Sequence, residues 1–275
     1  MKSLQGRTVA VIGAGKMGQA LIKGLLACGV SRTRLRAADP SRSIRRQAAR
    51  QFRITVVADN AAAAAGADVV LLAVKPQQMA EAIARLSPRL RGRPLVISIA
   101  AGITLDWLQR RLRGLPVIRV MPNLPATVGC GFSAIASGRR ATPRHRRMAI
   151  ELFSAVGEVV ELPERLFDAV TAVSGSGPAY VFLLVQVWEQ AARRLGLSSA
   201  VASRTIRCTL EGSVRLLQAS GLSASRLIAD VASKGGTTEA ALRVFAQRRL
   251  QAQFDEALRA AARRSKELSW SSRTS

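Results

Sequence analysis

Thr8-Val-Ala-Val-Ile12 and, directly after it, Gly13-Ala14-Gly15-Lys16-Met17-Gly18 form the stretch that decides the fold of this chain. The first five residues make a short, mostly β-branched run, which predicts a buried strand. From Ala20 to Leu26, apolar residues recur at helical spacing. Strand, glycine loop and helix in this order predict a dinucleotide-binding unit. Its first glycine makes the tight turn, its second lets the backbone meet a pyrophosphate, and its third lets helix and strand pack closely.

The residues after the next expected strand, Arg34 to Ala38, bear on the choice of nucleotide. Asp39 follows Gly18 by 21 residues, close to the spacing of about 20 at which an acid reads a ribose 2′-hydroxyl. That acid favours NAD. The arginines that follow, beginning with Ser41-Arg42, suit a 2′-phosphate and favour NADP. The sequence leaves the choice between NADH and NADPH open.

Further short apolar runs alternate with helical patterns through the first 160 residues or so. Asp68 to Val74 is continuously apolar after its first residue, as a strand buried on both faces should be, and it ends in Lys75-Pro76. The other expected strands are Val56–Val57, Pro94–Ile99 and Val117–Val120. This alternation predicts a doubly wound parallel sheet, whose ligands bind at the carboxyl ends of the strands.

Strand signals fade from Glu164 onward and helical patterns take over. We therefore expect an α/β N-terminal domain of the Rossmann type, residues 1–162, and an all-α C-terminal domain, residues 163–275. The helix expected over Ala179 to Ala192 is apolar on most sides. A small helical domain cannot cover such a surface alone, so a homo-oligomer is predicted; on periodicity alone, ordinary core packing within the chain is the alternative.

Composition narrows the class of protein further. The chain has 275 residues and a formal net charge of +25, a field that attracts polyanions. The arginines are spread along the whole chain and aromatic residues are only 4%, so specific nucleic-acid recognition is not expected. Three scattered cysteines predict neither a disulfide framework nor a metal site. No apolar run reaches the length of a membrane span and no signal pattern opens the chain, so a cytoplasmic protein is expected.

Ser233-Lys234-Gly235-Gly236-Thr237-Thr238 is a second glycine-rich turn, placed before a helical pattern that begins at Ala240. The glycines allow a sharp bend, and the N–H groups of a helix N-terminus favour an anion. This turn is a candidate anion site.

Six motifs in order carry a resemblance beyond the fold. They are Gly13–Gly18, Leu72-Ala-Val-Lys-Pro76, Ser98-Ile-Ala-Ala-Gly102, Arg119-Val-Met-Pro-Asn123, Ser174-Gly-Ser-Gly-Pro-Ala-Tyr180 and Ser233–Thr238. The set resembles the pyrroline-5-carboxylate reductase family from about Val9 to Ser265. The resemblance implies reduction of 1-pyrroline-5-carboxylate to L-proline with NADPH or NADH, the last step of proline biosynthesis. It also implies a C-terminal domain that forms a homodimer and often a larger assembly such as a decamer.

The resemblance implies roles for individual residues. Ser233 and the N–H groups of Gly235, Gly236 and Thr237 would bind the substrate carboxylate, and Thr238 would place its catalytic hydroxyl at the ring nitrogen. In an interlocked dimer this loop would complete the partner's site. The implied cofactor contacts are Gly13, Ala14, Gly15, Lys16, Met17, Gly18, Asp39, Ser41, Arg42, Asn60, Ala73, Val74, Lys75, Pro76, Ala100, Ala101 and Glu164.

Three residues depart from the family pattern. Lys234 stands where many members have proline, Leu124 replaces a common threonine, and Asp39 stands where many NADPH-preferring relatives have asparagine.

Two other interpretations of the function stay open. One is another imine or β-hydroxyacid reductase on the same scaffold, although the lysine typical of the latter is missing from Val181 to Arg194. The other is a polyanion-binding protein without catalysis, suggested by the charge.

Overall fold

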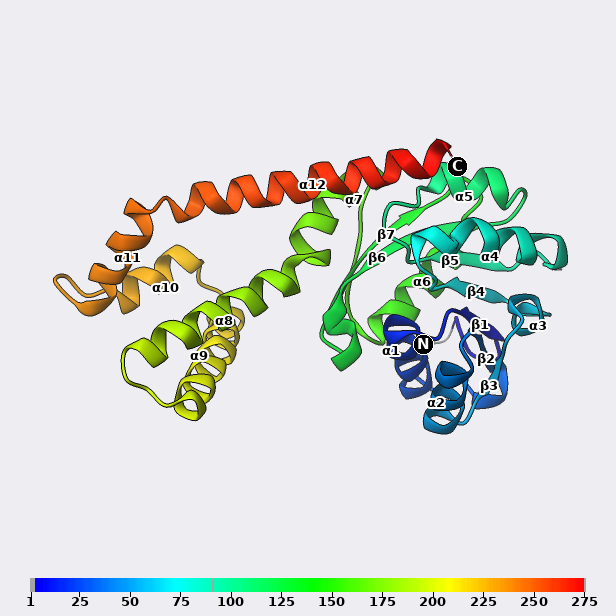
Figure 1. The fold of residues 1–275 in the computed structure, drawn as a ribbon. Helices are drawn as coiled ribbons and strands as arrows, with labels where there is room; N and C mark the ends of the chain where they lie inside the picture. The colour runs from blue at the N-terminus through cyan, green and yellow to red at the C-terminus, as the bar shows by residue number, and fades with distance from the viewer. Residues whose placement is uncertain (1–2, 91, 275) are drawn as a thin grey trace. The chain divides into compact units, whose positions relative to one another are not determined.

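Figure 1 shows the computed structural model, which describes residues 3–90 and 92–274. The chain forms two compact units. The first contains the chain up to Ser176 together with the segment from Ala261 onward, and the second is Gly177–Ala260. We describe each unit by itself.

An eight-stranded sheet forms the centre of the first unit, in the order β3-β2-β1-β4-β5-β6-β7-β8. Strands β1 to β6 run parallel, as the sequence predicts. The strands are β1 (Val9–Ile12), β2 (Leu35–Ala38), β3 (Thr55–Val57), β4 (Val69–Leu72), β5 (Leu95–Ser98), β6 (Val117–Pro122), β7 (Gly131–Ser137) and β8 (Gly157–Glu161). Since chain order reverses between β1 and β4, the topological switch point lies there.

The last two strands change the expected all-parallel sheet into a mixed one. β7 pairs antiparallel with β6, and β8 pairs parallel with β7. Neither strand was expected from the sequence. β7 reads Gly-Phe-Ser-Ala-Ile-Ala-Ser, in which small residues dilute the apolar signal, and β8 is an edge strand with half-exposed and exposed residues.

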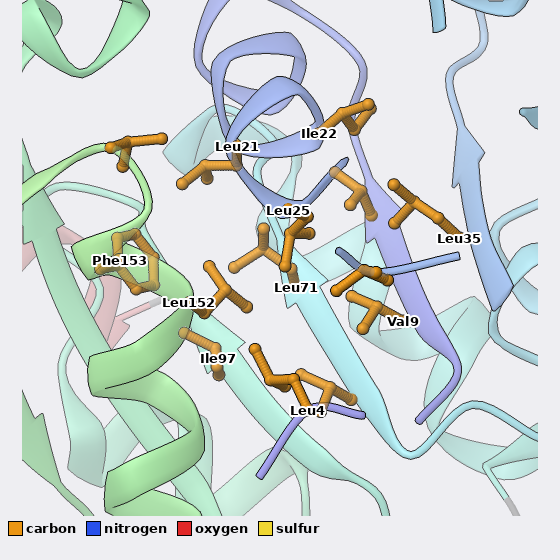
Figure 2. Close-up of a cluster of buried hydrophobic side chains, with 14 of the residues drawn as sticks. Leu4, Val9, Leu21, Ile22, Leu25, Leu35, Leu71, Ile97, Leu152 and Phe153 are labelled. Carbon is orange, nitrogen blue, oxygen red and sulfur yellow. The ribbon is translucent and has the colours of Figure 1, made fainter. Parts of the chain in front are cut away.

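Two cores lie on opposite faces of the sheet because successive strand residues point to opposite sides. Val9, Leu71 and Ile97 face one core, which α1 and α6 cover with Leu21, Leu25, Leu152 and Phe153 (Figure 2). Ile12, Leu72 and Val96 face the other, which α3, α4, α5 and α7 cover. The helices of this unit are α1 (Lys16–Ala27), α2 (Arg42–Phe52), α3 (Asn60–Ala64), α4 (Met79–Leu86), α5 (Leu105–Arg111), α6 (Pro143–Ser154) and α7 (Phe167–Val170).

The second unit is helical, as predicted. It contains α8 (Gly177–Arg194), α9 (Ser199–Ser220), α10 (Ala224–Val231), α11 (Thr237–Gln247) and the first part of α12 (Leu250–Thr274). Its buried cluster consists of Ala192, Ala202 and Ile206 with two half-buried neighbours. Many large apolar side chains are exposed instead, among them Phe182, Leu183, Trp188, Val214, Ile228 and Phe245. Such a surface marks an interaction face.

One helical segment differs from the expectation that no apolar run is long enough to span a membrane. Glu164–Arg194 is a 31-residue helical run that is long and apolar enough to cross a membrane, judged by length and composition only. Only 6% of its apolar window is buried within the chain. An apolar helix face that one chain leaves exposed is also what a subunit interface requires.

Candidate active site

A cavity of about 420 Å³ opens at the carboxyl ends of β1 to β4. Three of the predicted cofactor residues line it: Gly13 after β1, Asn60 at the start of α3, and Val74 after β4. Gly13 and Val74 flank the switch point, where open α/β sheets bind ligands. Polar residues that the sequence analysis did not select also line it, namely Asp59, Gln78, Glu81 and Arg85.

The three glycines of the first loop differ in their surroundings as a dinucleotide fingerprint requires. Gly13 has φ +99°, and a Cβ there would lie 2.6 Å from the carbonyl oxygen of Ala73. A Cβ on Gly18 would lie 2.1 Å from the carbonyl oxygen of Gly13. Around Gly15, by contrast, an added Cβ would meet nothing within 4 Å. The outer glycines are therefore needed for close packing, and the middle one leaves room for a ligand at the N-terminus of α1.

Asp39 links the glycine loop after β1 to the turn before α2, at the edge of the sheet where the parallel strands end. Its side chain is buried, and its two oxygens accept hydrogen bonds from the backbone N–H groups of Ala14 (3.0 Å) and Ser41 (2.9 Å). Arg45 donates to the carbonyl oxygens of Asp39 and Pro40. The spacing after Gly18 indicates the position of Asp39. In the structure, Asp39 holds the glycine loop and the turn before α2 together.

Other predicted cofactor residues follow the same strand ends. Ala73, Lys75 and Pro76 adjoin Val74 after β4, and Ala100 and Ala101 follow β5, the next strand. Ser41 caps α2, and Arg42 is its exposed first residue. Lys16 and Met17 open α1 next to Gly15. These residues therefore occur at one edge of the sheet.

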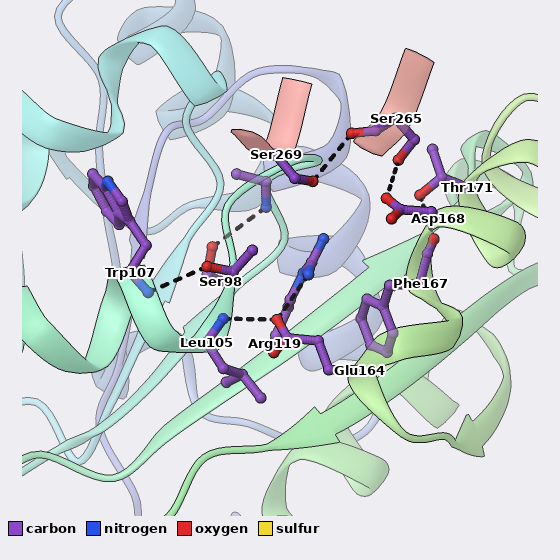
Figure 3. Close-up of polar contacts among 12 residues, drawn as sticks. Ser98, Leu105, Trp107, Arg119, Glu164, Phe167, Asp168, Thr171, Ser265 and Ser269 are labelled. Carbon is purple, nitrogen blue, oxygen red and sulfur yellow. Dashed lines mark hydrogen bonds and ion pairs between the residues drawn. The ribbon is translucent and has the colours of Figure 1, made fainter. Parts of the chain in front are cut away.

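Glu164 has a different role from the others. Its Oε1 accepts hydrogen bonds from the Leu105 N–H and from the Arg119 guanidinium, both at 2.7 Å (Figure 3). Arg119 is 3% exposed and lies over the Phe167 ring, 4.7 Å from its centroid. Glu164 is not among the residues lining the cavity in the part of the chain that the structure describes. A buried arginine requires a partner, and Glu164 supplies it.

The final turns of α12 dock beside this ion pair in the first unit. Ser265 donates its hydroxyl proton to the Asp168 carboxylate at 2.7 Å (Figure 3). Leu268 approaches Gly102 so closely that a Cβ on that glycine would lie 3.3 Å from the Leu268 carbonyl carbon. The C-terminal segment is thus fixed to the nucleotide-binding unit.

Residues Ser233 to Thr238, which we call the threonine loop, lie in the second unit and lead into α11. Gly235 has φ +73°, which favours glycine, and a Cβ on Gly236 would lie 2.4 Å from Ser233 Oγ, so a side chain there would displace that hydroxyl. The Gly236 N–H donates to the Ser233 carbonyl oxygen at 3.0 Å. The Gly235 N–H donates to the Glu239 carboxylate at 2.5 Å. The loop that was expected to bind a carboxylate therefore already binds one of its own.

Thr237 and Thr238 are the first two residues of α11, where backbone N–H groups have no acceptor within the helix. Thr238 is half-buried, and Ser233 and Lys234 are exposed. Of the predicted carboxylate ligands, the structure brings Ser233, Gly235, Gly236 and Thr237 together in one turn. Glu239, which the sequence analysis did not select, belongs to the same turn.

The fold and the nucleotide cavity define a nicotinamide-nucleotide-dependent oxidoreductase. Residues 8–102 match the profile of the family "NADP oxidoreductase coenzyme F420-dependent", and residues 164–268 match that of "Pyrroline-5-carboxylate reductase dimerisation". The chain is 44% identical over 262 residues to a pyrroline-5-carboxylate reductase of Pseudomonas aeruginosa, covering 94% of this chain and 96% of that protein.

Solved structures agree with these matches. The pyrroline-5-carboxylate reductase of Coxiella burnetii superposes with a TM-score of 0.89 at 33% identity, covering 96% of this chain and 98% of that one. The Plasmodium falciparum pyrroline carboxylate reductase, solved with NADP bound, gives a TM-score of 0.87 at 26% identity over 96% and 99% of the two chains. The chain belongs to the pyrroline-5-carboxylate reductase family, as the six motifs predicted.

Proposed function

We propose that this protein reduces 1-pyrroline-5-carboxylate to L-proline with NADPH or NADH, the last step of proline biosynthesis. The observation that carries the proposal is the 44% identity to a pyrroline-5-carboxylate reductase over 94% of the chain. The test is nucleotide oxidation that depends on 1-pyrroline-5-carboxylate. A β-hydroxyacid substrate should be inactive, since α8 contains no lysine.

The described residues fit a bound nicotinamide nucleotide. Open space at Gly15 would admit the pyrophosphate, and the cavity lined by Gly13, Asn60 and Val74 would hold the rest of the nucleotide near the switch point. When bound, the nucleotide supplies the hydride for the imine carbon. The residues of the chain orient the substrate relative to the nucleotide and prevent it from binding in other orientations.

The threonine loop would supply that orientation. Ser233 and the N–H groups at the start of α11 would bind the substrate carboxylate, an anion suited to a helix N-terminus. Thr238 would hydrogen-bond the ring nitrogen as it becomes an amine. Because a threonine hydroxyl is a poor acid, the proton comes through a water relay or is already on the imine when it binds. Thr238 then orients and stabilises that nitrogen.

We further propose a preference for NADPH. Asp39 already uses both carboxylate oxygens on backbone N–H groups, whereas Arg42 is exposed at the start of α2. We expect NADPH to bind about tenfold more tightly than NADH, a difference of about 1.4 kcal/mol. Fluorescence titration measures both dissociation constants. Arg42→Gln should weaken NADPH alone, while Arg50→Gln at the other end of α2 should change neither. Equal affinities for the two nucleotides would refute the preference.

Glu239 should compete with the substrate, because its carboxylate occupies the Gly235 N–H. Glu239→Gln replaces a charged acceptor by a neutral one, weakening that hydrogen bond by about 1 kcal/mol. We expect KM for 1-pyrroline-5-carboxylate to fall about fivefold. Glu211→Gln is the matched control, since both glutamates pair with an arginine four residues on. An unchanged or higher KM for Glu239→Gln would mean that Glu239 only supports the loop.

We propose that the helical segment, residues 163–275, forms a homodimer in which the loop of one chain completes the site of its partner. The exposed apolar side chains of α8 to α11 support this, and a second copy rather than a membrane would cover them. A decamer is the larger assembly we propose, in the cytoplasm and without a specific nucleic-acid partner. Co-expressing Thr238→Ala with Gly15→Ala chains should restore activity, since each supplies what the other lacks. No recovery would show that each site lies within one chain.

A further inference from the structure

A group of arginines gathers at the edge of the sheet opposite the nucleotide cavity. Arg7 precedes β1, and Arg93 precedes β5, so both lie at the amino ends of their strands. Arg144 and Arg147 come from the first turns of α6. Together these four residues line two cavities of about 380 and 410 Å³, which share Arg7 and Arg144 as common walls. We call the two joined cavities the arginine groove.

The arginine groove carries positive charge that the chain does not neutralise. Its two acidic residues are already engaged: Asp68 pairs with Arg7 at 2.6 Å, and Glu151 accepts a hydrogen bond from the Ser3 N–H. Within residues 3–90 and 92–274, Arg93, Arg144 and Arg147 have no recorded ion pair. Burial lowers the pKa of His145, which also lines the groove, so this imidazole adds little charge near neutral pH.

The placement of Arg144 and Arg147 is not favoured by the helix that carries them. The first turn of α6 has no acidic residue, and its arginines stand at the positive end of the helix dipole, where cations are disfavoured. Some exposed arginines elsewhere, such as Arg85, Arg110 and Arg215, pair with an acid four residues away, whereas Arg144 and Arg147 have no ion pair within the described residues. Two of the groove's arginines therefore stand at a helix end where positive charge is disfavoured.

We propose that the arginine groove binds a chain of phosphate groups. Guanidinium groups hold phosphate oxygens through paired, charge-assisted hydrogen bonds. Arg93, Arg144 and Arg147, which have no ion pair in the part of the chain that the structure describes, lie along the two joined cavities and so suit several phosphates in line rather than a single one. No phenylalanine, tyrosine or tryptophan lines the groove, so it lacks the large aromatic rings on which nucleobases usually stack. Recognition rests on the phosphates, whether they belong to inorganic polyphosphate or to the backbone of a single-stranded nucleic acid.

The test uses the full chain and fluorescently labelled inorganic polyphosphate, with binding followed by anisotropy over a series of salt concentrations. Arg144→Gln/Arg147→Gln should weaken binding at least tenfold and reduce the slope of log K against log salt by roughly 1.5, as expected for two lost phosphate contacts. The control, Arg50→Gln/Arg113→Gln, removes the same charge from exposed positions outside the groove. It should change affinity less than twofold.

Competition with single-stranded oligothymidylate of equal charge identifies the source of the phosphates. Displacement at matching concentrations assigns the groove to nucleic-acid backbone, and failure to displace assigns it to polyphosphate; both outcomes support a phosphate-chain site. Unchanged melting temperature and NADPH affinity in both double variants show that the fold is intact. Equal weakening by the control variant, or no binding by the unaltered protein at physiological salt, would overturn the proposal.

Discussion

Replacing Thr238 with alanine should lower kcat about a hundredfold and leave the Kd of NADPH within about a factor of two, as expected for one lost donor at the reacting atoms. Thr238 is the second residue of α11 in the second unit, whereas the glycine loop assigned to the nucleotide lies in the first unit. Alanine has a higher helix propensity than threonine, so the loss cannot come from an unstable helix.

The matched variant is Thr238→Ser, which keeps the hydroxyl. Steady-state kinetics should give Thr238→Ser most of the original kcat, and Thr237→Ala should retain it as well, since only the backbone of Thr237 is assigned to the substrate. If Thr238→Ala and Thr238→Ser lost activity equally, the hydroxyl would have no role. A small and equal effect of Thr238→Ala on turnover and on cofactor affinity would also exclude the assignment.

Gly15→Ala should raise the Kd of NADPH at least a hundredfold with little loss of stability. A methyl group at Gly15 meets no other atom within 4 Å, and its φ of −70° is open to any residue. The expected fall in Tm is only about 2–4 °C, because alanine is a poorer helix cap than glycine. The large effect on binding arises because the methyl group occupies the space where the pyrophosphate would meet the backbone.

Gly18→Ala is the informative comparison for Gly15→Ala. Its Cβ would collide with the Gly13 carbonyl oxygen at 2.1 Å, so this variant should lose stability and binding together. Differential scanning fluorimetry and fluorescence titration separate the two effects. Tight NADPH binding by Gly15→Ala would place the nucleotide elsewhere on the sheet.

Local sequence patterns were sufficient to predict a strand, loop or helix where the pattern that indicates it spans only a few residues. The first six strands are short, mostly apolar runs, and the glycine loop between β1 and α1 is predicted directly by the spacing of its glycines. β7 and β8 were not predicted from the sequence, because β7 is built from small residues and β8 is a polar edge strand. The helical C-terminal segment followed from the loss of strand signals and the rise of helical patterns after Glu164; in the structure Ser198 caps α9 and Ser223 caps α10.

Contacts between distant segments could not be predicted in this way. Arg119 stands inside an otherwise apolar strand, which signals a buried partner, but nothing local indicates that Glu164, 45 residues away, supplies it. The spacing located Asp39 but not its hydrogen bond to the Ala14 N–H, 25 residues earlier. Likewise, the threonine loop was recognisable from its glycines, whereas the carboxylate of Glu239 resting on Gly235 depends on the folded turn.

The most direct test of the central claim is a spectrophotometric assay of the purified chain with 1-pyrroline-5-carboxylate and either NADPH or NADH. We predict nucleotide oxidation that requires the substrate, is faster with NADPH at low nucleotide concentration, and yields L-proline in equal molar amount. No oxidation of either nucleotide, with a protein that is folded and binds NADPH, would contradict the assignment of this chain as a pyrroline-5-carboxylate reductase.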